Sequence, residues 1–146
     1  MTSWRDGGLR GRRGGWPGHR YNGAGWIRPD LRWGIRVRDL YRCFWCGGDL
    51  LVIGANTLDH VLPVSRGGTH APTNLITACR RCNVARGDLL LSEWRGARGR
   101  IRALRRQLRC PVDRKLGAEH RERFRAGEPM ATLQAELIGA DYFIPF

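Results

Sequence analysis

The sequence predicts an α+β fold in which a small β-hairpin and a short helix are held together by a four-cysteine zinc site and flanked by basic helices. Three observations predict it: two C-x-x-C pairs, β-prone apolar segments between them, and helical apolar spacing outside them. The 146 residues suit one domain or a small core with extensions. We expect three parts: a basic arm rich in glycine, arginine and tryptophan at 1–30, a central module at 31–91, and a helical extension at 92–146.

The first elements follow from local pattern. Residues 31–42 predict a short helix that leads into the first cysteine pair. The segment DLLVI (49–53) predicts a strand, and TLDHVLP (57–63) predicts its hairpin partner. Pro63 ends that partner, because proline cannot donate a hydrogen bond to a ladder.

The second half of the central module is expected to return to the cysteines. Residues 65–73 (SRGGTHAPT) predict a loop, and 74–78 (NLITA) form a further apolar, β-prone segment. From Cys79 onward the alternation typical of strands disappears, which predicts a helix.

A second helix is predicted between Ser92, a common N-cap residue type, and Pro111. Its apolar residues recur at spacings of three and four: Trp94, Ala97, Ile101, Leu104 and Leu108. Arginines follow the same spacing one position later, about 100° round the helix: Arg95, Arg98, Arg102, Arg105 and Arg109. This row is either a solvated face or a DNA-binding surface. We favour DNA because the segment HRERFR (120–125) adds positive charge.

The C-terminal tail combines a helical pattern with an aromatic end. Met130, Leu133 and Leu137 predict a short amphipathic helix, and YFIPF (142–146) is apolar and aromatic. We expect this tail to dock on its own domain; a protein partner that binds the tail is the alternative.

The charge indicates a polyanionic partner. The net charge is +13, with +6 in residues 1–40, +2 in 41–91 and +8 in 92–127. No run approaches the roughly 18 apolar residues of a membrane helix. The N-terminus lacks the apolar stretch of a secretory signal, so a cytoplasmic location is the default expectation.

The cysteine spacing predicts a structural zinc site. Zn²⁺ prefers four thiolates in a tetrahedron, and each C-x-x-C turn presents two of them. Two turns close the site, which leaves no open coordination position for catalysis. The predicted ligands are Cys43, Cys46, Cys79 and Cys82, and Cys110 stands alone.

Asp59 and His60 are neighbours where an apolar strand ends, although buried ionisable groups are costly unless they are paired or bind a metal. Histidine has a pKa suited to deprotonating water near neutral pH. We treat the remaining histidines as surface residues, because their sequence neighbours include no ligand-like partner: His19, His70 and His120.

From Cys43 to about Asp88, the order C-x-x-C … LDHVLPVSRGG … NLITAC-x-x-CN-x-x-RG resembles the HNH nucleases, whose fold is a ββα-metal (His-Me) finger. The resemblance implies a metal-dependent DNA endonuclease, a hydrolase of phosphodiester bonds. It implies that His60 is the general base and that Asp59 binds a catalytic divalent ion.

The same resemblance implies roles for three further residues. Asn74 would tie the long loop through backbone hydrogen bonds. Asn83 would be the second ligand of the catalytic ion, in place of the family's more common histidine, which makes this an H-N-N form. Arg86 replaces a frequent lysine and is expected to contact a phosphate of the DNA.

The implied cofactors are a structural Zn²⁺ and a catalytic Mg²⁺ or Mn²⁺, since a carboxylate with an amide oxygen is a hard ligand pair. Two other functions stay open: a non-enzymatic zinc module that binds nucleic acid, and a nuclease acting on RNA. Among the settings of small HNH proteins, a phage or mobile element fits best. Cleavage preference, nicking or double-strand cutting, and oligomeric state are not predicted.

Overall fold

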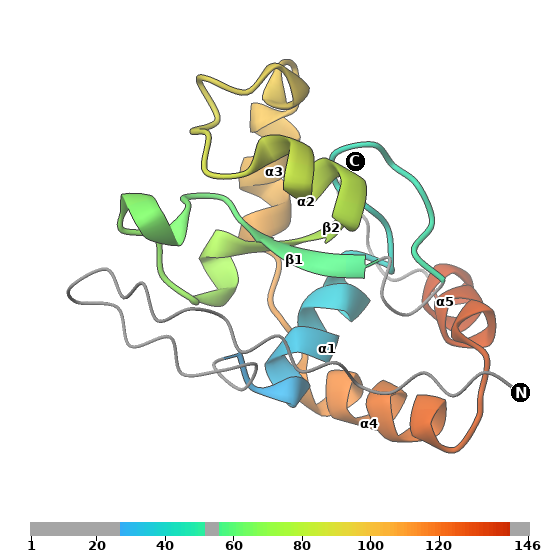
Figure 1. The fold of residues 1–146 in the computed structure, drawn as a ribbon. Helices are drawn as coiled ribbons and strands as arrows, with labels where there is room; N and C mark the ends of the chain where they lie inside the picture. Colours follow the sequence, from blue (N-terminus) through green and yellow to red (C-terminus); the bar gives the residue numbers. More distant parts are fainter. Residues whose placement is uncertain (1–26, 52–55, 141–146) are drawn as a thin grey trace, which may run out of the picture.

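A computed structural model describes residues 27–51 and 56–140 and confirms the α+β class (Figure 1). Its α-helices are α1 (Pro29–Arg38), α2 (Arg80–Arg86), α3 (Ile101–Arg109), α4 (Arg114–Arg125) and α5 (Met130–Gly139). Its strands are β1 (Asn56–His60) and β2 (Leu75–Cys79), and its 3-10 turns are η1 (Val64–Arg66), η2 (Pro72–Asn74) and η3 (Arg95–Ala97). None of the helices in these ranges has the length and apolar character that crossing a bilayer requires.

The strands and α2 form a ββα unit. β1 and β2 pair antiparallel, in a register that runs from Asn56 opposite Cys79 to His60 opposite Leu75. α2 follows β2 without a linker, and the Cys79 thiol caps it by accepting the backbone N–H of Cys82 at 3.3 Å. α2 packs against both strands, and α1 lies on the other side of the sheet (Figure 1). This arrangement matches a ββα-metal fold.

The predicted hairpin between residues 49–53 and 57–63 is wrong. Asp49 forms only an isolated bridge with Arg42, while the true partner of β1 is β2. Backbone hydrogen bonds from Cys43 to Gly48 and from Leu50 to Tyr41 fold this segment on itself, where it carries the first cysteine pair. The end of the expected strand, at residues 52–53, lies outside the described residues.

The helix predicted from Ser92 begins later than expected. Residues 95–97 form the turn η3, and Gly99 has a φ of +73°, so α3 begins only at Ile101. The apolar spacing nevertheless predicts the packing correctly. Ala97 and Leu104 are buried in one cluster with Ile76 and Ala78 of β2, and this packing fixes α3 against the ββα unit.

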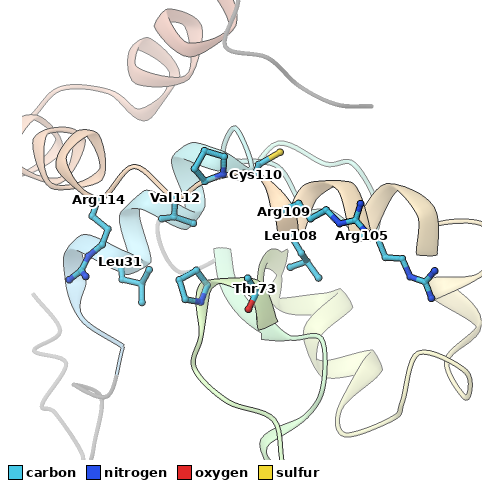
Figure 2. A pocket seen from close by; sticks show the side chains of 10 residues that line it. Leu31, Thr73, Arg105, Leu108, Arg109, Cys110, Val112 and Arg114 are labelled. Atoms are coloured by element: carbon cyan, nitrogen blue, oxygen red, sulfur yellow. The ribbon is translucent and has the colours of Figure 1, made fainter.

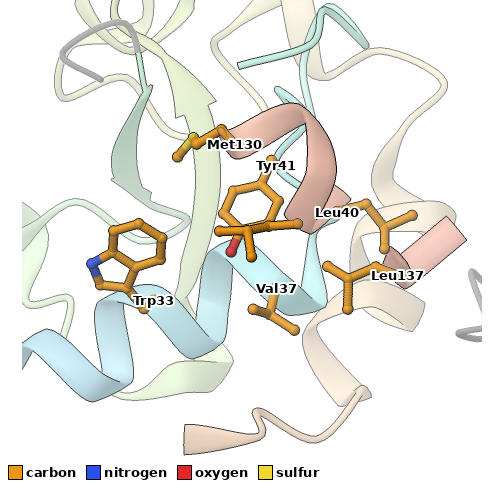
Figure 3. Packing of buried hydrophobic residues seen from close by; sticks show 7 residues of the cluster. Trp33, Val37, Leu40, Tyr41, Met130 and Leu137 are labelled. Atoms are coloured by element: carbon orange, nitrogen blue, oxygen red, sulfur yellow. The ribbon is translucent and has the colours of Figure 1, made fainter. Parts of the chain in front are cut away.

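The C-terminal extension shares a core with α1. Figure 3 shows side chains of α1, α5 and the segment after α1 meeting in one cluster: Trp33, Val37, Leu40, Tyr41, Met130, Leu133 and Leu137. The predicted amphipathic helix of the tail is therefore confirmed. Three tryptophans of the basic arm (Trp4, Trp16 and Trp26) and the YFIPF segment lie outside the described residues.

His120 is not a surface residue, which corrects the sequence prediction. It is 1% exposed, its Nδ1 lies 2.8 Å from the hydroxyl of Tyr41, and the two rings stack. Burial lowers its pKa. His120 is buried because α4 approaches α1 closely. At this contact a Cβ on Gly117 would lie 2.3 Å from the backbone nitrogen of Gly34.

Candidate functional site

The four paired cysteines converge on one point. Their sulfur atoms all lie within 4.8 Å of one another, and the sulfurs of Cys46 and Cys79 are 4.0 Å apart. A tetrahedral zinc with bonds of about 2.3 Å requires its sulfurs roughly 3.8 Å apart. The four residues therefore fit a structural zinc, which would join the turn at 43–46 to the junction of β2 and α2. In residues 27–51 and 56–140, no other cluster has three or more metal-ligating side chains.

Asp59 lies inside the protein at the interface of β1 and α2. Its side chain is 3% exposed, its Oδ1 is ion-paired with Arg86, and its Oδ2 accepts a hydrogen bond from the indole N–H of Trp45 at 2.8 Å. The Arg86 guanidinium also lies over the Trp45 ring, 5.7 Å from the centroid. Burial raises the pKa of Asp59, while the Arg86 charge and the Trp45 hydrogen bond act in the opposite direction.

Arg86 holds the end of β1 to α2, which differs from its expected role. It is 1% exposed, and its guanidinium donates hydrogen bonds to the carbonyl oxygens of His60 and Val61 as well as to Asp59. A guanidinium with these partners does not face solvent. The phosphate contact expected from the resemblance is therefore not supported by this arrangement.

Replacement of Arg86 by methionine is expected to lower the free energy of unfolding by about 3–5 kcal/mol, because it leaves the Asp59 carboxylate buried without its cation. Urea unfolding of the zinc-loaded protein measures this change. Arg81→Met, at an exposed position of the same helix, is the control and should change the midpoint little. Equal midpoints for the two variants would contradict the role given to Arg86.

His60 is paired with a second histidine. Its Nε2 lies 2.9 Å from Nδ1 of His70, with ring centroids 5.1 Å apart and planes at 62°. Burial lowers the pKa of His60 to about 4, with further contributions from the charges of His70 and Arg86. The imidazole is therefore neutral at pH 7, which is the form that accepts a proton. His70 is exposed, as the sequence predicts, but the prediction that it has no partner was wrong.

Asn74 closes the loop between the two strands. Its Oδ1 accepts the backbone N–H of Leu62 at 2.8 Å, and its Nδ2 donates to the carbonyls of Leu62 at 3.0 Å and Thr69 at 2.8 Å. These are backbone hydrogen bonds of the kind that the resemblance implies. Two glycines allow the crossing: Gly67 has a φ of +88°, and a Cβ on Gly68 would lie 1.7 Å from the carbonyl oxygen of Leu62.

Asn83 points from α2 toward β1. Its Nδ2 donates to the hydroxyl of Thr57 at 2.8 Å and to the carbonyl of Leu58 at 3.3 Å. Its side-chain Oδ1 accepts no hydrogen bond from the residues that the structure describes. A carboxylate offers about four lone-pair positions, of which Arg86 and Trp45 use one on each oxygen of Asp59. Carboxylate and amide oxygens are ligand types that hard divalent ions take, although the Asp59 carboxylate is already ion-paired with Arg86.

The arginines of the predicted row are exposed, but only Arg102, Arg105 and Arg109 lie on α3, so the five do not form a stripe along one helix. The members of the row form no ion pair within residues 27–51 and 56–140: Arg95, Arg98, Arg102, Arg105 and Arg109. By contrast, Arg123 in the segment HRERFR pairs with Glu128 at 2.6 Å and Glu136 at 2.7 Å. That segment adds less free positive charge than its composition predicts.

A groove of about 610 Å³ lies at the C-terminal end of the arginine row (Figure 2). Leu31, Leu108 and Val112 supply apolar walls, and Arg105 and Arg109 from α3 also line it. The groove continues the basic surface toward η2, the turn that ends in Asn74.

Sequence reasoning missed Trp45 and His70 as parts of the site. Trp45 stands between two zinc ligands, where a large aromatic side chain is a signal for local packing. Its indole N–H donates a hydrogen bond to Asp59, and its ring packs edge-on against the Trp94 ring, with the two centroids 4.8 Å apart. The loop residue His70 has no comparable signal, because its place beside His60 depends on how the loop closes.

Residues 43–89 match the family model of HNH endonuclease, which covers about a third of the chain. No curated protein matches the chain, and no solved structure does. The match confirms the resemblance read from the sequence for this segment. Since the family consists generally of nucleases, it indicates a nuclease or nucleic-acid-binding module with a metal-binding cysteine cluster.

Proposed function

We propose that the protein is a metal-dependent DNA endonuclease that hydrolyses phosphodiester bonds with His60 as the general base. The observation that carries the proposal is the position of His60 within the matched segment. It is the last residue of β1, it is only half-buried, and it precedes the loop that Asn74 closes. A module that only binds nucleic acid would have no need of a histidine at this position.

The residues divide the chemistry between them. His60 takes a proton from water, since its imidazole is neutral at pH 7. Asn74 keeps the loop after His60 closed against Leu62 and Thr69. Asp59 and Asn83 would hold Mg²⁺ or Mn²⁺, which supplies charge stabilisation for the phosphate when bound. A zinc held by the four cysteines would be structural, because four thiolates would complete its coordination and leave no position for substrate.

The test of this proposal is cleavage of supercoiled plasmid across a titration of Mg²⁺ and Mn²⁺. Asn83→Ala is expected to raise the metal concentration required for cutting, because it removes one ligand and leaves the base in place. Val84→Ala, at the next position of α2 and 72% exposed, is the matched control and should behave as the parental protein does. If no metal supports cutting, the proposal is contradicted. If the protein cuts RNA and not DNA, it is a nuclease whose substrate is RNA.

DNA binding is proposed to be mainly electrostatic and tolerant of sequence, because the exposed arginine row makes no ion pairs within the described ranges. If about six phosphates are neutralised, affinity should fall roughly 10³-fold between 50 and 200 mM salt. Replacing Arg98, Arg102 and Arg105 by glutamate should weaken binding and reduce the salt slope by roughly one per arginine.

Reversal of Arg125 is the control for the triple variant. This residue is exposed on α4 but lies 3.6 Å from Glu122, so its charge is already partly compensated. Fluorescence anisotropy with labelled duplexes at several salt concentrations measures both variants. An unchanged salt slope in the triple variant would show that the row does not face DNA.

One observation favours the second candidate function, a non-enzymatic zinc module that binds nucleic acid. The Asp59 carboxylate already has a cation and a hydrogen-bond donor within the protein. If the pair with Arg86 persisted when Mg²⁺ is present, Asp59 would serve packing alone. The metal titration separates the two functions, because a binding module retains nucleic acid and cuts none.

A further inference from the structure

We propose that His70 is a positioning residue for His60. It accepts a hydrogen bond from Nε2–H of His60, which keeps the proton on that nitrogen and leaves the lone pair of Nδ1 for a proton from water. The inference rests on the proposed nuclease function, since it assigns His70 a part in the same site.

The geometry of the pair supports a direct hydrogen bond between the rings. Nε2 of His60 and Nδ1 of His70 are 2.9 Å apart, the usual distance for a nitrogen donor. One of these two nitrogens must carry the hydrogen. A neutral imidazole has one N–H and one acceptor nitrogen, so the direction of this bond decides which nitrogen of His60 can accept a proton.

Only one direction supports catalysis at Nδ1. If His60 donates, its second nitrogen is unprotonated and basic. If His70 donates, the proton of the neutral His60 ring sits on Nδ1, and that atom cannot accept another. The hydrogen-bond partner of one ring nitrogen commonly sets the tautomer of a functional histidine. His70 is the hydrogen-bond partner of Nε2 of His60.

The loop is built to hold the two rings together. Asn74 bonds to Leu62, which follows His60 by two positions, and to the carbonyl of Thr69, which directly precedes His70. One side chain therefore fastens both segments that carry the histidines. Gly68 allows the crossing, because any Cβ there would overlap the carbonyl of Leu62.

The first test is the tautomeric state of His60, measured by ¹⁵N NMR of imidazole nitrogens on the zinc-loaded full chain without DNA. We expect an Nε2–H tautomer in the parental protein and a mixture of tautomers in His70→Ala. His70→Asn should restore the single tautomer, because its Oδ1 can take the place of Nδ1 as acceptor. A packing role for His70 would not produce this pattern.

The second test is plasmid cleavage at saturating DNA. His70→Ala is expected to cut about 10- to 100-fold more slowly, the usual cost of removing a group that orients a functional histidine, with unchanged DNA binding. His70→Asn should recover most of the rate. Ser65→Ala, at an exposed position of the same loop, is the control and should cut at the parental rate.

Two results would overturn the inference: an Nδ1–H tautomer of His60 in the parental protein, or parental cleavage by His70→Ala. The NMR measurement requires no catalysis. If the parental protein cuts no nucleic acid, the proposed function fails, while the tautomer pattern still decides whether His70 orients His60.

Discussion

His60→Ala is expected to bind DNA with parental affinity and to cut it about 10²–10⁴-fold more slowly, the usual contribution of a general base. Binding should survive because the exposed arginines of the row that includes Arg98 and Arg102 lie outside the ββα unit. The measurement is plasmid cleavage with saturating Mg²⁺ or Mn²⁺, next to a binding assay on the same preparation. The expected result is thus a loss of turnover alone.

Zinc content and thermal unfolding are the controls for this variant. His60 is only half-buried, so its truncation should leave the fold and the zinc site intact. A parental cutting rate in His60→Ala would remove the general-base role and favour the non-enzymatic zinc module. Loss of DNA binding together with activity would instead place His60 at the binding surface.

Cys82→Ser is expected to unfold the central module and to abolish zinc binding. The zinc would join two segments that are far apart in sequence, since Cys46 and Cys79 are separated by 33 positions. Structural zinc in small domains has an apparent binding free energy of about 10–16 kcal/mol, and whole domains are stable by only about 5–15 kcal/mol. Loss of one thiolate therefore removes most or all of the stability.

Metal analysis and circular dichroism measure this effect. Cys110→Ser is the matched control, because Cys110 lies outside the cluster and donates only a weak 3.5 Å hydrogen bond to the carbonyl of Arg106. It should retain one zinc per chain and the parental melting temperature. A parental protein that folds without zinc would contradict the structural role of the site.

The sequence by itself determined the parts of this protein that depend on local spacing. Two C-x-x-C pairs predict a tetrahedral thiolate site wherever the chain brings them together, and the structure does so. The apolar spacing of Leu133 and Leu137 predicts the buried face of α5. The motif positions of His60, Asn74 and Asn83 all fall within the segment that matches the HNH family model.

Only the tertiary structure decided which distant segments meet. β1 pairs with β2 across a long loop and not with the nearer apolar segment at 49–53, because the near segment folds back on the first cysteine turn. The local apolar pattern is similar in both segments, so it cannot choose between them. The start of α3 likewise depends on η3 and Gly99, which the apolar spacing conceals.

The roles of individual polar residues were decided in the same way. Arg86 lies 27 positions from Asp59, and His120 lies 79 positions from Tyr41, yet each pair shares a buried contact. His70 meets His60 only because Asn74 and Gly68 bring the loop back on itself. Sequence spacing shows which residues share a face of one helix or strand. The partner of a buried polar side chain depends instead on how separate elements pack, because packing decides which groups come within hydrogen-bonding distance.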